Sequence, residues 1–119
     1  MIDRILVADD EFMIREVLEE TIKRHDIEVI TASNGDEAKK MLEKYDFQMA
    51  FVDLKMGKTT GMDVLKHCRA KSPSTLFVLM TAYGTVETAV DAIKMGAYDF
   101  ILKPFSPDQT DVIIEKANK

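Results

Sequence analysis

Uninterrupted hydrophobic runs alternate along this chain with segments in which hydrophobic residues recur every three or four positions. Each run predicts a β-strand that is buried on both faces, and each periodic segment predicts a helix that buries one stripe. The predicted strands cover residues 5–8, 29–30, 47–52, 76–80 and 98–102. The predicted helices follow them at about residues 11–24, 34–45, 62–72, 84–95 and 106–117.

The predicted helices carry start and stop signals at their ends. Asn34 with Glu37 three positions later reads as a capping box, and residues 106–109 combine a serine cap with a proline at the first helical position. Gly96 ends the fourth helix. The stripes expected to be buried in the fourth and last helices are Val86, Ala89, Val90 and Ile93, and Val112, Ile113 and Ala117.

Five alternating strand–helix units predict an α/β fold, in which a doubly wound five-stranded parallel sheet carries helices on both faces. A chain of 119 residues is long enough for one domain with one core. Because the sequence contains no linker, low-complexity stretch or repeat, we expect residues 1–119 to form a single domain. In such folds, ligands bind outside the carboxyl ends of the strands.

The composition narrows the classes of protein that remain. The chain is 46% hydrophobic and 31% charged, as is ordinary for a globular protein, and no apolar run approaches the ~20 residues of a membrane span. A net charge of -5 argues against direct nucleic-acid binding. The single cysteine, Cys68, excludes an internal disulfide. With no secretory signal at the start, the expected compartment is the cytoplasm.

Reactive side chains stand where four of the predicted strands end. Asp9 and Asp10 follow the first run, Asp53 the third, Thr81 the fourth and Lys103 the fifth. Each has an ordinary alternative role, such as a helix cap for Asp10 or a solvated surface amine for Lys103. Because the carboxyl ends of parallel strands meet at one edge of the sheet, we expect these five side chains to converge.

Three converging carboxylates repel one another. At ~4 Å and an effective dielectric near 20, each pair costs about 4 kcal/mol, against the ~5–15 kcal/mol by which a domain is stable. The cluster therefore requires a cation or a raised pKa, and hard oxygen ligands favour Mg²⁺. Together with a lysine and a threonine hydroxyl, this set has the parts for phosphoryl transfer to Asp53.

Four segments carry a resemblance to a known family. From residue 5 to about 116, the chain resembles the receiver domain of bacterial two-component response regulators, which implies a flavodoxin-like (βα)5 fold with strand order 2-1-3-4-5. Within it, residues 81–105 are most similar to receivers of activators of the sigma-54 polymerase. The matching segments are residues 6–11 (LVADDE), 51–56 (FVDLKM), 81–84 (TAYG) and 103–105 (KPF).

The resemblance implies a role for each residue at the strand ends. Asp53 matches the phosphoacceptor. Asp10 matches the direct Mg²⁺ ligand, Asp9 a ligand acting mostly through water, and the Lys55 backbone carbonyl a further ligand; Asp53 completes the metal set.

Three further matches concern the switch. Thr81 matches the hydroxyl that bonds the phosphoryl group, and Lys103 matches the cation that pairs with it. Phe100 matches an aromatic that turns inward on activation, although a plain core residue of the fifth strand explains it equally well. The resemblance also implies a cis bond before Pro104.

The implied function is a phosphorylation switch rather than an enzyme acting on a substrate. A sensor histidine kinase would supply the phosphoryl group, and the surface of the fourth helix, fifth strand and fifth helix would change to control an output, expected to be transcription. A homodimer through the same face is compatible with the resemblance. The output would belong to a further domain or to a target protein, with neither nucleic-acid nor membrane binding by this domain.

The sequence departs from the family pattern at Gly57, where proline is usual, so we expect a looser loop over residues 57–61. Gly57-Lys58-Thr59 also resembles the end of a P-loop, but the glycine required five positions earlier is Val52, which excludes that motif. Lys55 and Tyr83 lie two residues after the acceptor and after Thr81, and the resemblance implies that these two positions tune attack by water on the phosphoryl group. A bulky Tyr83 and a long Lys55 are therefore expected to shield the phosphoryl group and to slow its loss.

Two other classes of protein remain open on the residues alone. A flavodoxin-like electron carrier shares the fold, but the acidic residues 9–11 would repel a flavin phosphate. An Mg²⁺-dependent phosphatase also uses an aspartyl nucleophile, but it needs a general acid two positions later, where this chain has Lys55. The chain is compatible with a free-standing receiver and with part of a longer regulator.

Overall fold

The computed structural model describes residues 1–82 and 84–118, in which five parallel strands form one sheet. The strands are β1 (Arg4–Ala8), β2 (Glu28–Ala32), β3 (Met49–Asp53), β4 (Leu76–Thr81) and β5 (Asp99–Leu102). Their spatial order is β2-β1-β3-β4-β5, and every neighbouring pair is parallel. The predicted flavodoxin-like α/β fold with strand order 2-1-3-4-5 is confirmed.

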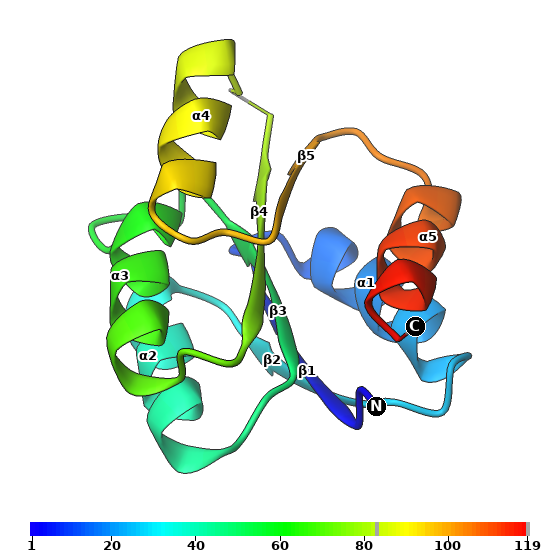
Figure 1. Cartoon of the computed structure of the whole chain (residues 1–119). Coiled ribbons are helices and arrows are strands. Elements are labelled where there is room, and N and C mark those ends of the chain that lie inside the picture. Colours follow the sequence, from blue (N-terminus) through cyan, green and yellow to red (C-terminus); the bar gives the residue numbers. More distant parts are fainter. Residues whose placement is uncertain (83, 119) are drawn as a thin grey trace.

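The helices cover both faces of this sheet (Figure 1). They are α1 (Phe12–Lys23), α2 (Gly35–Lys44), α3 (Gly61–Lys71), α4 (Val86–Lys94) and α5 (Pro107–Ala117). Figure 1 shows α2, α3 and α4 on one side of the sheet, and α1 and α5 on the other. Successive strand residues point to opposite faces, so Leu6 lies in the core under α2 and α3 while Ile5 lies in the core under α1 and α5. Unbroken hydrophobic runs are the consequence.

The helix starts follow the predicted signals with one change. The Asn34 side chain accepts a hydrogen bond from the Glu37 N–H at 2.8 Å, as a cap should. The Glu37 carboxylate, however, accepts from the Ser33 N–H at 2.9 Å instead of returning to Asn34, so the capping box is shifted by one residue. At α5, Gln109 accepts from the Ser106 N–H at 2.9 Å, as predicted.

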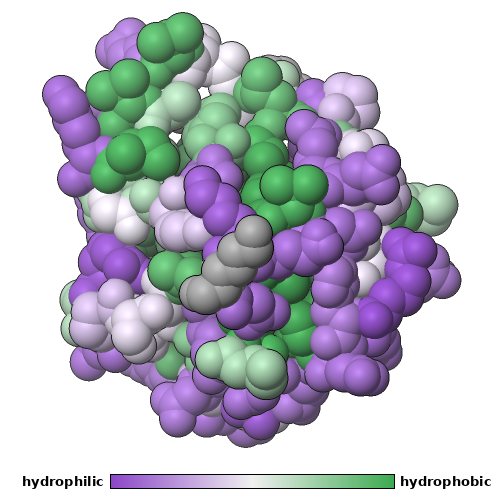
Figure 2. All heavy atoms as spheres, turned by 45° about the vertical axis from the view of Figure 1, so that its right-hand side comes forward, coloured by the Kyte–Doolittle hydropathy of each residue, from purple (hydrophilic) through white to green (hydrophobic). Residues whose placement is uncertain are grey.

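Of the stripe expected to be buried in α4, the three larger side chains face solvent and Ala89 is half-buried. Val86 is 83% exposed, Val90 43% and Ile93 49%, and the buried member of the helix is Ala92. In α5, Val112 is likewise exposed, and Thr110 and Ile114 join Ile113 in the core. Figure 2 shows the hydrophobic side chains that gather on the surface at the α4 end of the molecule. Periodicity identified both helices correctly but assigned the wrong face to α4.

Two backbone features lie near the end of the sheet that carries the reactive residues. The Lys103–Pro104 peptide bond is cis, as the family resemblance implies. Gly57 has a φ of 90°, a value that proline cannot adopt. Within the described residues, no helix has both the length and the apolar character required to cross a membrane.

Candidate functional site

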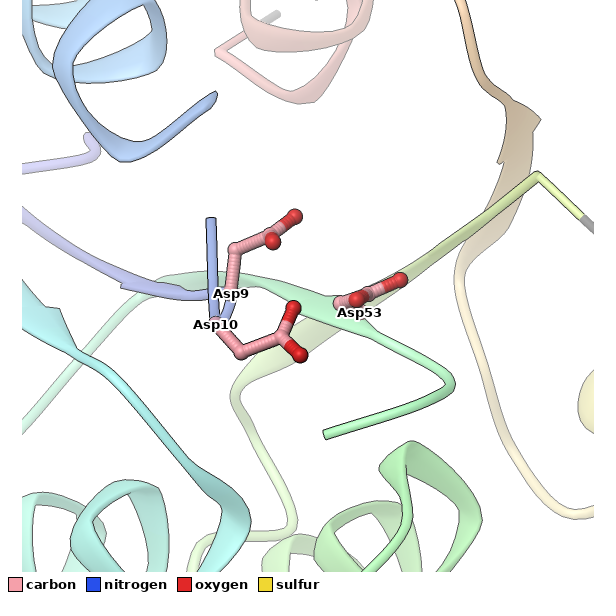
Figure 3. A group of neighbouring side chains, drawn as sticks. All are labelled: Asp9, Asp10 and Asp53. Carbon is pink, nitrogen blue, oxygen red and sulfur yellow. The ribbon is translucent and has the colours of Figure 1, made fainter. Parts of the chain in front are cut away.

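The fold brings the three carboxylates together at the carboxyl edge of the sheet (Figure 3). Asp9 directly follows β1, Asp53 is the last residue of β3, and these two strands are neighbours. One carboxylate oxygen from each of Asp9, Asp10 and Asp53 lies within 4.8 Å of the other two. Asp9 and Asp53 are buried, whereas Asp10 is exposed. The convergence predicted from the strand ends is therefore present.

Lys103 is the cation of this cluster. The alternative that Lys103 is a solvated surface amine is wrong, because its side chain is only 9% exposed. Its Nζ lies 2.6 Å from Asp9 Oδ2 and 3.4 Å from Asp53 Oδ1. Glu11 Oε1 lies 3.8 Å from the same nitrogen, a contact that the sequence did not reveal. The amine is thus held between the two buried carboxylates.

The charges remain only partly balanced by this one amine. Burial, followed by the negative charge of Asp9, raises the pKa of Asp53 to about 6 against the opposing effect of Lys103. Burial also raises the pKa of Asp9, although its hydrogen bond with Lys103 works in the opposite direction. Burial alone would lower the pKa of Lys103, but its contacts with Asp9 and Asp53 carry it above the ordinary value. The site therefore favours an additional cation.

The donor atoms available to such a cation are all oxygens. A pocket of about 240 Å³ opens beside the carboxylates and is lined by Asp10, Glu11, Asp53, Lys55, Ala82 and Lys103. Asp9 Oδ2 contacts Lys103 Nζ at 2.6 Å and accepts no other hydrogen bond among the described residues. Clustered carboxylate oxygens with an exposed member suit a hard, hydrated divalent cation such as Mg²⁺.

Two of the hydrogen bonds that hold Asp9 involve residues that the sequence did not point to. Arg15, one turn into α1, donates to the Asp9 backbone carbonyl at 2.7 Å. The Glu11 N–H donates to Asp9 Oδ1 at 2.9 Å. The cap residue of α1 is Glu11, without a side-chain cap bond, so the alternative of Asp10 as a helix cap does not describe this structure. An arginine at that spacing is indistinguishable in sequence from any exposed helix residue.

Thr81 and Phe100 lie on the β4–β5 side of the site. Thr81 is fully buried at the end of β4, and its carbonyl accepts a hydrogen bond from the Lys103 N–H at 2.9 Å. Phe100 is half-buried and packs so closely against Gly84 that a side chain at Gly84 would collide with its ring. The loop after Thr81 therefore touches Phe100 directly. The predicted shielding residue Tyr83 lies outside the described residues.

A comparison with protein families agrees with this geometry. Residues 5–115 match the model of the response regulator receiver domain. The chain belongs to the response regulator receiver family. Receivers are phosphorylation switches rather than enzymes that turn over a substrate.

Curated relatives of this receiver have different overall lengths. The alginate biosynthesis transcriptional regulatory protein AlgB of Pseudomonas aeruginosa is 40% identical over 106 residues, which cover 89% of this chain and 24% of AlgB. The chain thus spans about a quarter of the length of that relative. The chemotaxis protein CheY of Listeria monocytogenes is 36% identical over 117 residues and is covered to 98%, as is this chain.

A solved structure closely matches the receiver. The beryllofluoride-activated NtrC4 receiver domain dimer superimposes with a TM-score of 0.90 at 33% identity, covering 96% of this chain and 94% of that one. In that relative, the activated receiver is described as a dimer.

Proposed function

We propose that this receiver, over residues 1–119, accepts a phosphoryl group from a sensor histidine kinase on Asp53 and thereby controls a downstream output. The observation that carries the proposal is the placement of the Asp53 carboxylate. It ends β3 inside a polar pocket that it shares with two further carboxylates and the Lys103 amine. With such a kinase as donor, the expected compartment is the cytoplasm.

The chemical step forms an acyl phosphate. A carboxylate oxygen of Asp53 bonds to phosphorus, the P–N bond to the kinase imidazole breaks, and the imidazole leaves with a proton from solvent. Because the pKa of Asp53 is about 6, the carboxylate is mostly ionised and nucleophilic at neutral pH. Lys103, already 3.4 Å from Asp53, exchanges its carboxylate contacts for a phosphoryl oxygen.

Asp9, Asp10, Asp53 and the Lys55 backbone carbonyl would hold Mg²⁺. When bound, the ion supplies positive charge that offsets the charge on the phosphoryl oxygens. The observation in its favour is the unbalanced carboxylate cluster, which Lys103 alone does not neutralise. Asp9 has two roles in this scheme. It would bind the metal through water, and its carboxylate forms the ion pair that holds Lys103 in place before phosphorylation.

The switch uses the residues that follow β4. The Thr81 hydroxyl bonds the new phosphoryl group and draws the next residues toward the site, and Phe100 responds because its ring packs against Gly84. To invert a 1:99 ratio of two states, the phosphoryl contacts must favour the active state by about 5.5 kcal/mol. A few charge-assisted hydrogen bonds, at ~1.5–3 kcal/mol each, supply that difference.

The surface that responds is the face of α4, β5 and α5. It carries the exposed Val86, Val90 and Leu102 beside a pocket of about 470 Å³ that Phe100 helps to line. The activated NtrC4 receiver domain is a dimer, which supports a homodimer, and the exposed apolar side chains of this face are the reason for placing the contact here. Transcription is the output we favour, because AlgB is named a transcriptional regulatory protein. The output would be delivered by a further domain or by a separate target protein, since this chain covers 24% of AlgB but 98% of the Listeria CheY.

The proposal is tested by incubating the protein with acetyl phosphate and Mg²⁺ and measuring intact mass. We expect one phosphoryl group on the wild type and none on Asp53→Asn. Asp46→Asn, which changes an exposed aspartate before β3, is the matched control and should be modified like the wild type. Modification of Asp53→Asn at the wild-type rate would show that another residue is the acceptor.

A further inference from the structure

The loop that connects β3 to α3, residues 54–60, begins directly after Asp53 and contains the Lys55 carbonyl proposed as a metal ligand. Its middle has little to fix its shape. Gly57, at a φ of 90°, is exposed, and a Cβ built on it would meet no atom within 4 Å. Lys58 is also exposed. The shape of the loop must therefore be set by the residues on either side of this pair.

Anchors on both sides are visible. Met56 is 4% exposed and lies in the core beneath α2 and α3. Thr59 donates its hydroxyl hydrogen to Asp36 Oδ1 at 2.6 Å, in the first turn of α2. Thr59 also lies directly on the buried Gly35, where an added Cβ would be 2.5 Å from the Thr59 carbonyl oxygen and 2.6 Å from its Cγ2. The start of α2 thus forms a seat for Thr59.

The far end of the loop returns to the phosphoacceptor. Thr60 caps α3, and the next residue, Gly61, donates its N–H to the Leu54 carbonyl at 2.8 Å. A Cβ on Gly61 would lie 2.5 Å from the Asp53 carbonyl oxygen, so the backbones of Gly61 and Asp53 are in close contact. Any shift of Thr59 is therefore carried through two residues to the backbone of Asp53 and Leu54.

We propose that Thr59, seated on Gly35 and hydrogen-bonded to Asp36, is a positioning residue that fixes the loop beside Asp53 and thereby the metal site. This inference rests on the proposed function, because it concerns the same carboxylate and the Lys55 carbonyl. It gives α2, which contributes no side chain to the carboxylate cluster among the described residues, an effect on metal binding and phosphorylation.

Four variants distinguish the effect of the Thr59 hydroxyl, the effect of the packing of Thr59 on Gly35, and the general effect of replacing a threonine. Thr59→Val removes the hydroxyl at constant shape, and Thr59→Ser keeps it. Gly35→Ala adds a methyl group that presses on the backbone and side chain of Thr59, while the Thr59 hydroxyl and the Asp36 carboxylate are both kept. Thr21→Val is the matched control, because the Thr21 hydroxyl bonds to Val17 within α1.

Two measurements are made on each purified protein. Hydrogen exchange of residues 55–61 in the metal-free protein reports whether Thr59 fixes the loop. Calorimetric titration with Mg²⁺ reports whether fixing the loop strengthens metal binding. We expect Thr59→Val and Gly35→Ala to exchange faster in that segment and to bind Mg²⁺ about tenfold more weakly. Thr59→Val should do so at an unchanged midpoint of unfolding. Thr59→Ser and Thr21→Val should match the wild type in both measurements.

The outcomes distinguish this inference from the proposed function. Unchanged hydrogen exchange in Thr59→Val would show that Thr59 does not fix the loop, whatever the Mg²⁺ affinity of the variant. Faster exchange with unchanged Mg²⁺ affinity would overturn the positioning role while wild-type phosphorylation still supports the proposed function. A wild type that neither binds Mg²⁺ nor becomes phosphorylated would overturn the proposed function, and the positioning role with it.

Discussion

At Asp53, burial and the neighbouring Asp9 act in the same direction, and Lys103 opposes both. Ionisation of this carboxylate therefore costs free energy in the folded protein when no metal is bound. Its pKa lies at about 6 in the fold and at 3.8 in the unfolded chain. Between these values the folded state holds a proton that the unfolded state has released, so stability falls as the pH rises through this window. Above pH 6 the full cost of the charge is present.

Asp53→Asn should therefore stabilise the metal-free protein at neutral pH. At pH 7.5 we expect a gain of about 1–3 kcal/mol in the free energy of unfolding, shrinking below pH 6 and disappearing near pH 4. Urea denaturation of the wild type and the variant across this range measures the difference, with Asp46→Asn as an exposed control. A variant that is less stable than the wild type at pH 7.5 would contradict the charge balance described here.

Lys103 supports a second prediction at the residue scale, because it is the partner of two buried carboxylates. Lys103→Met should lower stability at pH 7.5 by about 3–5 kcal/mol, since breaking a buried ion pair leaves uncompensated charge. Added Mg²⁺ should restore part of the loss by replacing the missing cation. Lys58→Met, on the exposed loop, is the matched control. Equal destabilisation with and without Mg²⁺ would argue against a shared cation site.

Among the elements, α4 differs most from its expected packing. In the part of the chain that the structure describes, hydrophobic periodicity predicted the five strands, the five helices and their order, because strand and helix periods are local properties. Which stripe of a helix faces the sheet is decided by tertiary contacts. α4 contains several hydrophobic residues on more than one side, and it packs against the sheet through the small Ala92, leaving its larger side chains exposed. The prediction from the sequence assumed that the larger hydrophobic residues are the buried ones, and it therefore assigned the opposite face to the core.

A matched pair of substitutions in α4 tests this orientation. Val86→Asp should change the free energy of unfolding by less than about 0.5 kcal/mol, because the side chain is exposed and an acid is favourable at a helix start. Ala92→Asp should cost more than about 3 kcal/mol, because it buries an unpaired charge. Chemical denaturation of both variants provides the comparison. A large loss for Val86→Asp would mean that the predicted stripe is the packed one.

At the scale of the whole molecule, the sheet order gathers residues that are far apart in sequence, and the sequence allowed this to be predicted. Asp9, Asp53 and Lys103 each end a predicted strand, and parallel strands share one edge. The supporting contacts from Glu11, Arg15 and the Thr59 seat were not foreseeable. They depend on rotamers and loop paths, which leave no periodic signal.

The exposed α4 stripe and the carboxylate cluster together predict an assembly that depends on activation. A monomer that exposes Val86, Val90 and Ile93 has an apolar patch available for burial by a second copy. With Mg²⁺ and beryllofluoride, we expect light scattering to show the mass doubling from 13.5 kDa. Asp53→Asn should remain monomeric because it lacks the acceptor. The double variant Val90→Ser with Ile93→Ser should still bind Mg²⁺ yet remain monomeric. If the double variant dimerises as well as the wild type, the interface does not lie on α4. Its carboxylate site is unchanged, so a failure to dimerise would reflect the lost apolar side chains.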